Sequence, residues 1–319
     1  MRRAELIATA GPRMLRPAWV RVLAGGSAVY AVLTAAAIDT QDVNLVPAVL
    51  VLGAALIPVA FVVYVFERLA VAPALLSPLV ICFAGGGSLG VAAAALLEYQ
   101  TLRNLGALPM LAVGLIEESV KMIVPAWLFA RRRFRGAADG VLFGVAAGMG
   151  FAVMETMGYG LVELIRSGGR IGDAEQTLLV RGVLSPGGHA AWTGMVAAAL
   201  WRTAAPSGRG RAWTALTGTF AAAVLLHALW DATDSAAVRL VVALVGMALL
   251  AVQIRRAAPQ PAATGHAVRR APSRRAGEDG HRVVAGAEAQ QPARAAPDEV
   301  DRVLGPAVDG HDDGREVRP

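Results

Sequence analysis

The chain has 319 residues, 55% of them hydrophobic, with a mean hydropathy of +0.52 and a formal net charge of +6. A soluble protein of this composition would expose large apolar patches and aggregate. Its arginines lie in short stretches between apolar runs, which argues for a lipid bilayer and against nucleic acid as the partner. The single cysteine, Cys82, leaves no partner for a disulfide within the chain.

The spacing of the apolar runs predicts an all-α polytopic membrane protein with about eight transmembrane helices, because about 20 apolar residues are enough to cross a bilayer. Residues 1–18 are predicted to be a cytoplasmic segment and residues 19–254 the transmembrane domain. Residues 255–319 are rich in Ala, Pro, Gly, Arg and acids, which predicts a disordered cytoplasmic tail. The predicted spans are Trp19–Ile38, Leu45–Phe66, Ala72–Leu97, Leu105–Ala130, Asp139–Ile165, Leu178–Trp201, Ala212–Asp234 and Ala236–Val252.

Arginine usage predicts the orientation of these spans. Fifteen arginines flank one set of span ends and five flank the other, among them Arg103, Arg239 and those of an expected loop from Arg166 to Arg181. The end with more arginines faces the cytoplasm in most membrane proteins. We therefore expect a multi-pass protein of the cell membrane with both termini in the cytoplasm, which agrees with an even number of spans.

The fourth span contains the segment "GLIEESVKMIVPAWLF", in which Glu117, Glu118 and Lys121 interrupt an apolar run. Charged residues inside a membrane helix cost roughly 2.5–3.5 kcal/mol on insertion scales and usually face a functional cavity. Lys121 is the only lysine among 30 basic residues. It lies four residues after Glu117 and three after Glu118, so it can pair with either. A purely structural ion pair would leave the second glutamate unexplained.

The fifth span carries Gly140, Gly144 and Gly148 at four-residue intervals, a stripe that permits close contact between helices. Glu155 lies on nearly the same face as Gly148. We therefore expect Glu155 to point towards a packed neighbouring helix and away from lipid.

Two histidines lie in the spans, and the other three lie in the tail. His189 follows Pro186, Gly187 and Gly188, which suggest a break in the sixth span. In the seventh span, His227 precedes Asp231 by four residues, so both lie on one helix face.

Counted from the outer ends at about 1.5 Å per residue, Glu117 and Glu155 lie roughly 15–18 Å deep and the two histidines roughly 11–12 Å. This agreement predicts one polar cavity that water enters from outside. Its residues could serve as a general base on water, as ligands of a divalent metal, or as a proton or ion relay. The HExxH, GxSxG and GxGD signatures are absent, so the residues themselves do not decide between a hydrolase and a carrier.

The order of four motifs narrows these alternatives. "EESVK" fits an EExxK pattern, "FAVME" fits FxxxE, and "GGHAAWTG" and "HALWD" supply the histidines. Between residues 114 and 234 this order resembles the PrsW family of intramembrane proteases, relatives of the CAAX prenyl protease and bacteriocin-processing superfamily. A transporter and a non-catalytic membrane scaffold are the alternatives.

The resemblance implies cleavage of single-pass membrane proteins, such as anti-sigma factors, near the outer surface. It implies Glu117 as the base that activates water, with Glu118 and Lys121 as its electrostatic partners. Asp231 would orient His227 or touch substrate. Glu155, His189 and His227 would orient water, bind the oxyanion or hold a divalent metal such as zinc. Members of the family are often called metalloproteases, but a metal-free glutamate mechanism fits these residues equally well, so the cofactor stays open.

Overall fold

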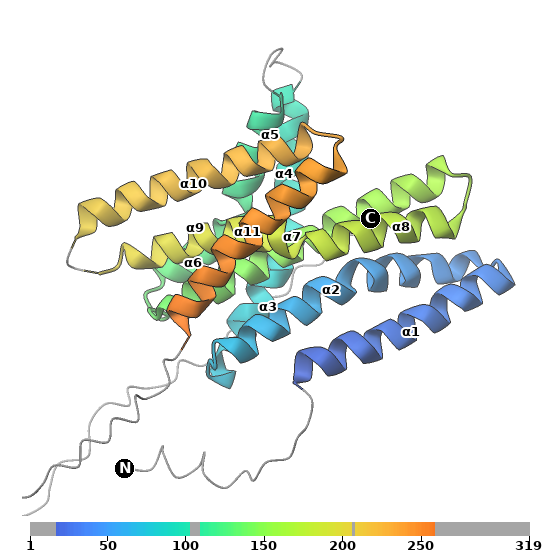
Figure 1. The fold of residues 1–319 in the computed structure, drawn as a ribbon, viewed down its shortest axis with the longest axis horizontal. Helices are drawn as coiled ribbons and strands as arrows, with labels where there is room; N and C mark the ends of the chain where they lie inside the picture. The colour runs from blue at the N-terminus through green and yellow to red at the C-terminus, as the bar shows by residue number, and fades with distance from the viewer. Residues whose placement is uncertain (1–16, 103–108, 206–207, 259–319) are drawn as a thin grey trace, which may run out of the picture. The chain divides into compact units, whose positions relative to one another are not determined.

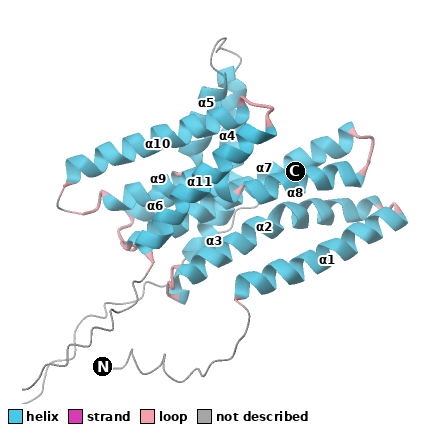
Figure 2. Cartoon of the chain, viewed as in Figure 1, coloured by secondary structure: helices cyan, strands magenta, loops and turns pink. Residues whose placement is uncertain are grey.

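The structure is a computed structural model that describes residues 17–102, 109–205 and 208–258, and every regular element in these ranges is helical (Figure 2). Six of the helical segments are long and apolar enough to cross a membrane. The prediction of an all-α polytopic protein is confirmed. The predicted cytoplasmic segment and tail fall mostly on residues 1–16 and 259–319, outside the described residues.

The first two spans form a hairpin. Helix α1 (Ala18–Thr40) and helix α2 (Val46–Arg68) are joined by the short 3₁₀ turn η1 (Val43–Leu45) and lie side by side (Figure 1). The Asp42 side chain accepts a hydrogen bond of 2.9 Å from the Asn44 N–H and so caps this turn.

The third span contains a π-helical segment that the sequence did not predict. After the turn η2 (Pro73–Leu75), helix α3 (Leu76–Ala84) passes through the π segment η3 (Gly85–Leu89) into helix α4 (Gly90–Leu102). The glycines of η3 lie against a later helix so closely that a Cβ on Gly87 would be 2.8 Å from the Gly150 carbonyl oxygen.

The fourth predicted span is broken into helices α5 (Pro109–Lys121) and α6 (Ile123–Ala130), and its first residues, 105–108, lie outside the described ones. The break at Met122 follows from Pro125, which has no N–H to donate to the Lys121 carbonyl. Met122 instead closes a tighter turn through a 3.2 Å bond to the Ser119 carbonyl.

Helix α7 (Ala137–Arg166) is buried by helices on several sides, and it packs against α2, α3, α8, α9 and η3 (Figure 1). The predicted glycine stripe is confirmed as a close helix contact. A Cβ on Gly144 would lie 2.6 Å from both the Thr193 carbonyl oxygen and the Ala197 Cβ. Because the two backbones touch, polar side chains near this contact are shielded from lipid.

The sixth span consists of helix α8 (Ile171–Leu184), the π segment η4 (Pro186–Ala190) and helix α9 (Ala191–Arg202). The predicted break at the Pro-Gly-Gly sequence is confirmed. The expected loop from Arg166 to Arg181 is shorter than predicted. Only residues 167–170 are non-helical, because Asp173 lies in the first turn of α8, where an acid stabilises a helix N-terminus.

The last two spans are helix α10 (Arg209–Asp231) and helix α11 (Ala236–Ala257). Helix α10 packs against α5 at Gly114, where a Cβ would lie 2.9 Å from the Val224 carbonyl oxygen and 3.4 Å from the His227 Cβ. Helix α11 packs against η4, where Gly246 touches the Gly187 carbonyl. Glycines therefore bring α5, α7, α10 and η4 together around the same interior.

Candidate active site

The charged residues of α5 lie at its C-terminal end and face inwards. Lys121 Nζ donates to Glu117 Oε2 at 3.0 Å and to Glu118 Oε1 at 2.9 Å. Lys121 and Glu118 are fully buried, whereas the Glu117 side chain is 10% exposed. The lysine thus neutralises part of both carboxylates, where pairing with one of them was expected.

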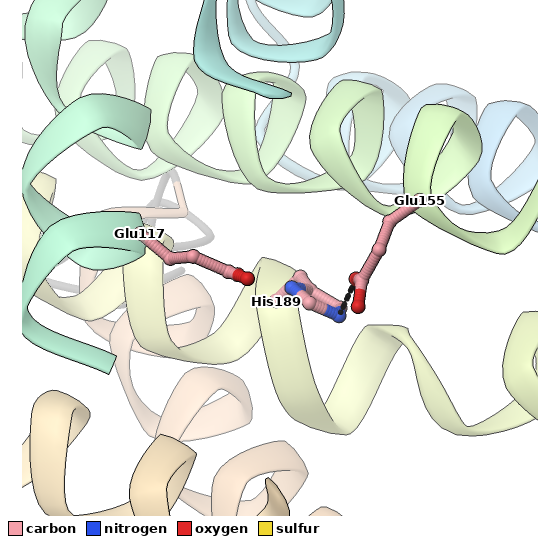
Figure 3. Close-up of side chains that lie close together, drawn as sticks. All are labelled: Glu117, Glu155 and His189. Atoms are coloured by element: carbon pink, nitrogen blue, oxygen red, sulfur yellow. Dashed lines mark ion pairs between the residues drawn. The ribbon is translucent and has the colours of Figure 1, made fainter. Parts of the chain in front are cut away.

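His189 connects this cluster to α7. Its Nδ1 lies 3.0 Å from Lys121 Nζ, and its Nε2 lies 3.1 Å from Glu155 Oε2. Glu117 and Glu155 approach His189 from opposite sides (Figure 3). The π segment η4 places the histidine here, because it lets the chain pass Gly148, which contacts the His189 carbonyl.

His227 closes the cluster from α10. Its Nδ1 lies 2.9 Å from Glu118 Oε1, and its Nε2 lies 3.3 Å from Glu117 Oε2 and 3.2 Å from Asp231 Oδ2. The Trp192 ring packs against the imidazole with centroids 4.9 Å apart. All seven sequence-predicted site residues are therefore joined in one network of contacts.

A cavity of about 660 Å³ gives access to this network. Glu117, Glu155 and Asp231 line it, whereas Glu118, Lys121 and His227 lie behind them. The lining of the cavity extends to Arg166 and Arg239, near the ends of the spans that were predicted to face outwards. The network thus has a front layer that a substrate can reach and a rear layer that holds it in place.

The sequence reasoning missed several residues of the site. Arg181 of α8 donates to Glu155 Oε1 at 2.8 Å, and its guanidinium lies 4.0 Å from the Tyr159 ring centroid. The arginine distribution assigns Arg181 to the loop from Arg166 to Arg181, although it also lies within the predicted span Leu178–Trp201. A charged side chain inside an apolar span was the signal that could have identified Arg181. Thr193, which donates to Glu118 Oε2 at 3.4 Å, carries no such signal.

The donor atoms fit a divalent metal. Glu117, Glu155 and His189 each offer an atom within 4.8 Å of the other two. Glu155 Oε2 is buried and lies 3.1 Å from His189 Nε2, so a metal at this position would take the place of that contact. Two carboxylates and an imidazole are donors that zinc accepts, with an open position left for water. The candidate metal ligands predicted from the sequence are Glu155, His189 and His227. In the structure, the candidate group is Glu117, Glu155 and His189.

The charge balance of the cluster depends on His227. Both of its ring nitrogens face carboxylates, and only an imidazolium donates from both. With His227 as a cation and His189 neutral, four carboxylates face three basic side chains, so the network keeps a formal charge of −1. The carboxylates are Glu117, Glu118, Glu155 and Asp231, and the basic side chains are Lys121, Arg181 and His227. A cation bound in the cavity would offset this excess, which is costly to bury in a membrane.

A comparison with protein-family models decides the family. The model of the PrsW family intramembrane metalloprotease matches residues 41–254, which include every residue of the network. The chain belongs to the PrsW family. Neither a search of curated proteins nor a search of solved structures gives a match.

PrsW membership makes the protein an intramembrane protease, and the membrane-spanning helices make it a multi-pass membrane protein. The membership favours a hydrolytic role for the buried network, since a peptidase needs a water-accessible site that contains acids or bases.

We predict that Lys121→Met lowers the free energy of unfolding by about 3–5 kcal/mol, because Glu118 stays buried without its cation. Thermal unfolding in detergent measures the loss. Glu118→Gln added to Lys121→Met should restore much of the stability, and Arg131→Met, an exposed control, should change it little. Unfolding of Lys121→Met at the wild-type temperature would show that the ammonium does not hold the cluster together.

Proposed function

We propose that the protein cleaves single-pass membrane proteins of the anti-sigma-factor type near the extracytoplasmic surface of the cell membrane. The attacking water molecule is activated by Glu117. The observation that carries this proposal is the position of Glu117. It is the one member of the adjacent Glu117–Glu118 pair that lines the cavity.

The residues around Glu117 suit it to accept a proton. Lys121 and His227 hold its Oε2 at 3.0 Å and 3.3 Å, which fixes the carboxylate in one orientation. When water attacks the peptide carbonyl carbon, the carboxylate takes the water's proton and returns it to the departing amine as the C–N bond breaks. Asp231 holds His227 in place from the cavity side.

A zinc ion is the metal we propose for this site, since carboxylate and imidazole ligands suit it. When bound, it polarises a carbonyl and lowers the pKa of a water molecule. Glu155 and His189 would hold it, with Glu117 as its third protein ligand or as the base beside it. His189 Nδ1 accepts from the Lys121 ammonium 3.0 Å away, which puts the imidazole proton on Nε2, so zinc bound through Nε2 would have to displace that proton.

The cavity could hold a short stretch of peptide, since its volume is about 660 Å³. Glu98, Arg181 and Arg239 line the cavity with one carboxylate and two guanidinium groups. Acceptors and donors of this kind could bond the N–H and C=O groups of a backbone that has been unwound.

We expect Glu117→Gln to lower kcat by about 10²-fold or more with the fold intact, because an amide cannot take a proton. The assay is cleavage of single-pass anti-sigma-like proteins by the purified protein in nanodiscs, with and without a chelator. Glu163→Gln, a second acid in the cavity lining, is the matched control and should cleave normally.

Zinc content measured by mass spectrometry separates the two roles of Glu117. Full zinc with lost cleavage identifies a base, whereas lost zinc identifies a ligand. If Glu117→Gln cleaves like the wild type, the proposed site is wrong, and ion flux in proteoliposomes would then test the transporter alternative.

Glu98→Met should raise KM about tenfold and leave kcat nearly unchanged, because the substrate loses an acceptor but the reacting groups stay in place. The same cleavage assay over a range of substrate concentrations measures both constants. Glu163→Met controls for the lost charge. A fall in kcat alone would assign Glu98 to the chemistry instead of substrate binding.

We also propose that both termini face the cytoplasm, which the arginine distribution supports. Cys82 is buried, so Cys82→Ala gives a background without cysteine. In whole cells, an impermeant maleimide should label Asn44→Cys and spare Arg133→Cys until the cells are opened. The reverse labelling pattern would invert the topology.

A further inference from the structure

A second large cavity lies at the end of the helices opposite to the loop of residues 167–170. It has a volume of about 610 Å³ and lies between the α6–α7 loop and the facing ends of α9 and α10, where Thr203, Ala204 and Arg209 line it. Three arginines line it together with aromatic rings, and the lining contains no acid. The lining residues that matter here are Arg132, Arg135, Arg209, Phe129, Phe134 and Trp213.

The loop that carries two of these arginines is held in a defined conformation. Arg132 adopts a left-handed backbone conformation with φ of 55°, and Arg135 Nε donates to its carbonyl at 3.0 Å. Trp201 Nε1 donates to the Phe134 carbonyl at 3.2 Å and ties the loop to α9. The arginines therefore converge from a fixed turn and do not lie on a free loop.

None of the three arginines forms an ion pair with a carboxylate in the described ranges. The acid of the neighbouring helix turn, Asp139, accepts from the Gly136 N–H at 2.8 Å and caps α7. Three uncompensated guanidinium groups around one hollow form a site for an anion with several oxygens, and a phosphate is the group that arginine forks bind best.

We propose that this cavity binds the phosphate headgroup of an anionic membrane phospholipid. Trp213 of the lining is 51% exposed, and Trp127, which precedes the lining residue Phe129 by two positions on α6, is 46% exposed, as in the aromatic belt at a membrane interface. Basic pockets between transmembrane helices are known sites for acidic lipid headgroups. The exposed apolar face of α6, including Ile123, offers a surface for the acyl chains.

The site has a structural consequence. The cavity joins the end of α6 to the start of α10. The α5–α6 pair carries Glu117, and α10 carries His227. A bound headgroup would hold these two elements together from the far end. Because such a lipid binds the folded protein and not the unfolded one, it should also raise the unfolding temperature.

Native mass spectrometry of the whole protein, with phosphatidylglycerol and phosphatidylcholine as probes, tests the proposal. The wild type should retain phosphatidylglycerol over phosphatidylcholine and should unfold at a higher temperature in its presence. The triple variant Arg132→Gln, Arg135→Gln, Arg209→Gln should bind phosphatidylglycerol about tenfold more weakly or worse.

A matched triple variant removes the same charge from neighbouring positions outside the cavity lining: Arg131→Gln, Arg133→Gln and Arg211→Gln. It should retain the lipid. A second pair of variants keeps all the arginines. Ala204→Trp fills the cavity and should lose the lipid, whereas Ala205→Trp lies outside the lining and should not.

If both triple variants lose the lipid equally, general charge and not this cavity sets the affinity, and the proposal is overturned. It is also overturned if neither triple variant loses the lipid, because these arginines then do not bind it. Retention of lipid by Ala204→Trp would overturn it as well. Displacement of the lipid by inorganic phosphate, with no preference between the two lipids, would show a site for free anions and not for a headgroup.

Discussion

The structure depends on the burial of one ammonium group. Lys121 Nζ lies within 3.0 Å of two carboxylates and of His189, and 4.3 Å from the Phe151 ring centroid. A charge at this depth is tolerated only when its partners surround it. Because those partners come from α5 and η4, and His227 of α10 joins them through Glu118, the ion cluster fixes how three separate spans meet.

Close backbone contact makes this burial feasible. Gly114, Gly148 and Gly187 each allow a neighbouring backbone to lie where a Cβ would stand, so α5, α7, η4 and their partners pack closely around the charges. Small residues serve this purpose in membrane helices, where no hydrophobic force drives the helices together. The close packing at these glycines shields the network on one side, while a cavity lies beside Glu117 on the other.

Much of the fold and the site could be predicted because ionisable residues are rare in apolar spans. Each of Glu117, Glu155, His189 and His227 stood out against its span, and the structure joins all of them. The sequence could not tell which of Glu117 and Glu118 faces the cavity, since neighbours on a helix differ by about 100° and either face could be inward. The π segment η3 was missed because glycines also occur in ordinary membrane helices.

The division of the network into a front and a rear layer follows from the burial of the Lys121 ammonium. Glu118 makes contacts with Lys121, Thr193 and His227, so its oxygens are occupied by the protein. Glu117 shares the same lysine and histidine through one oxygen, Oε2, and its carboxylate reaches the cavity. Two adjacent residues of one type thus differ in their environment: the fully enclosed carboxylate is held by protein groups on all sides, and the other is open to the cavity.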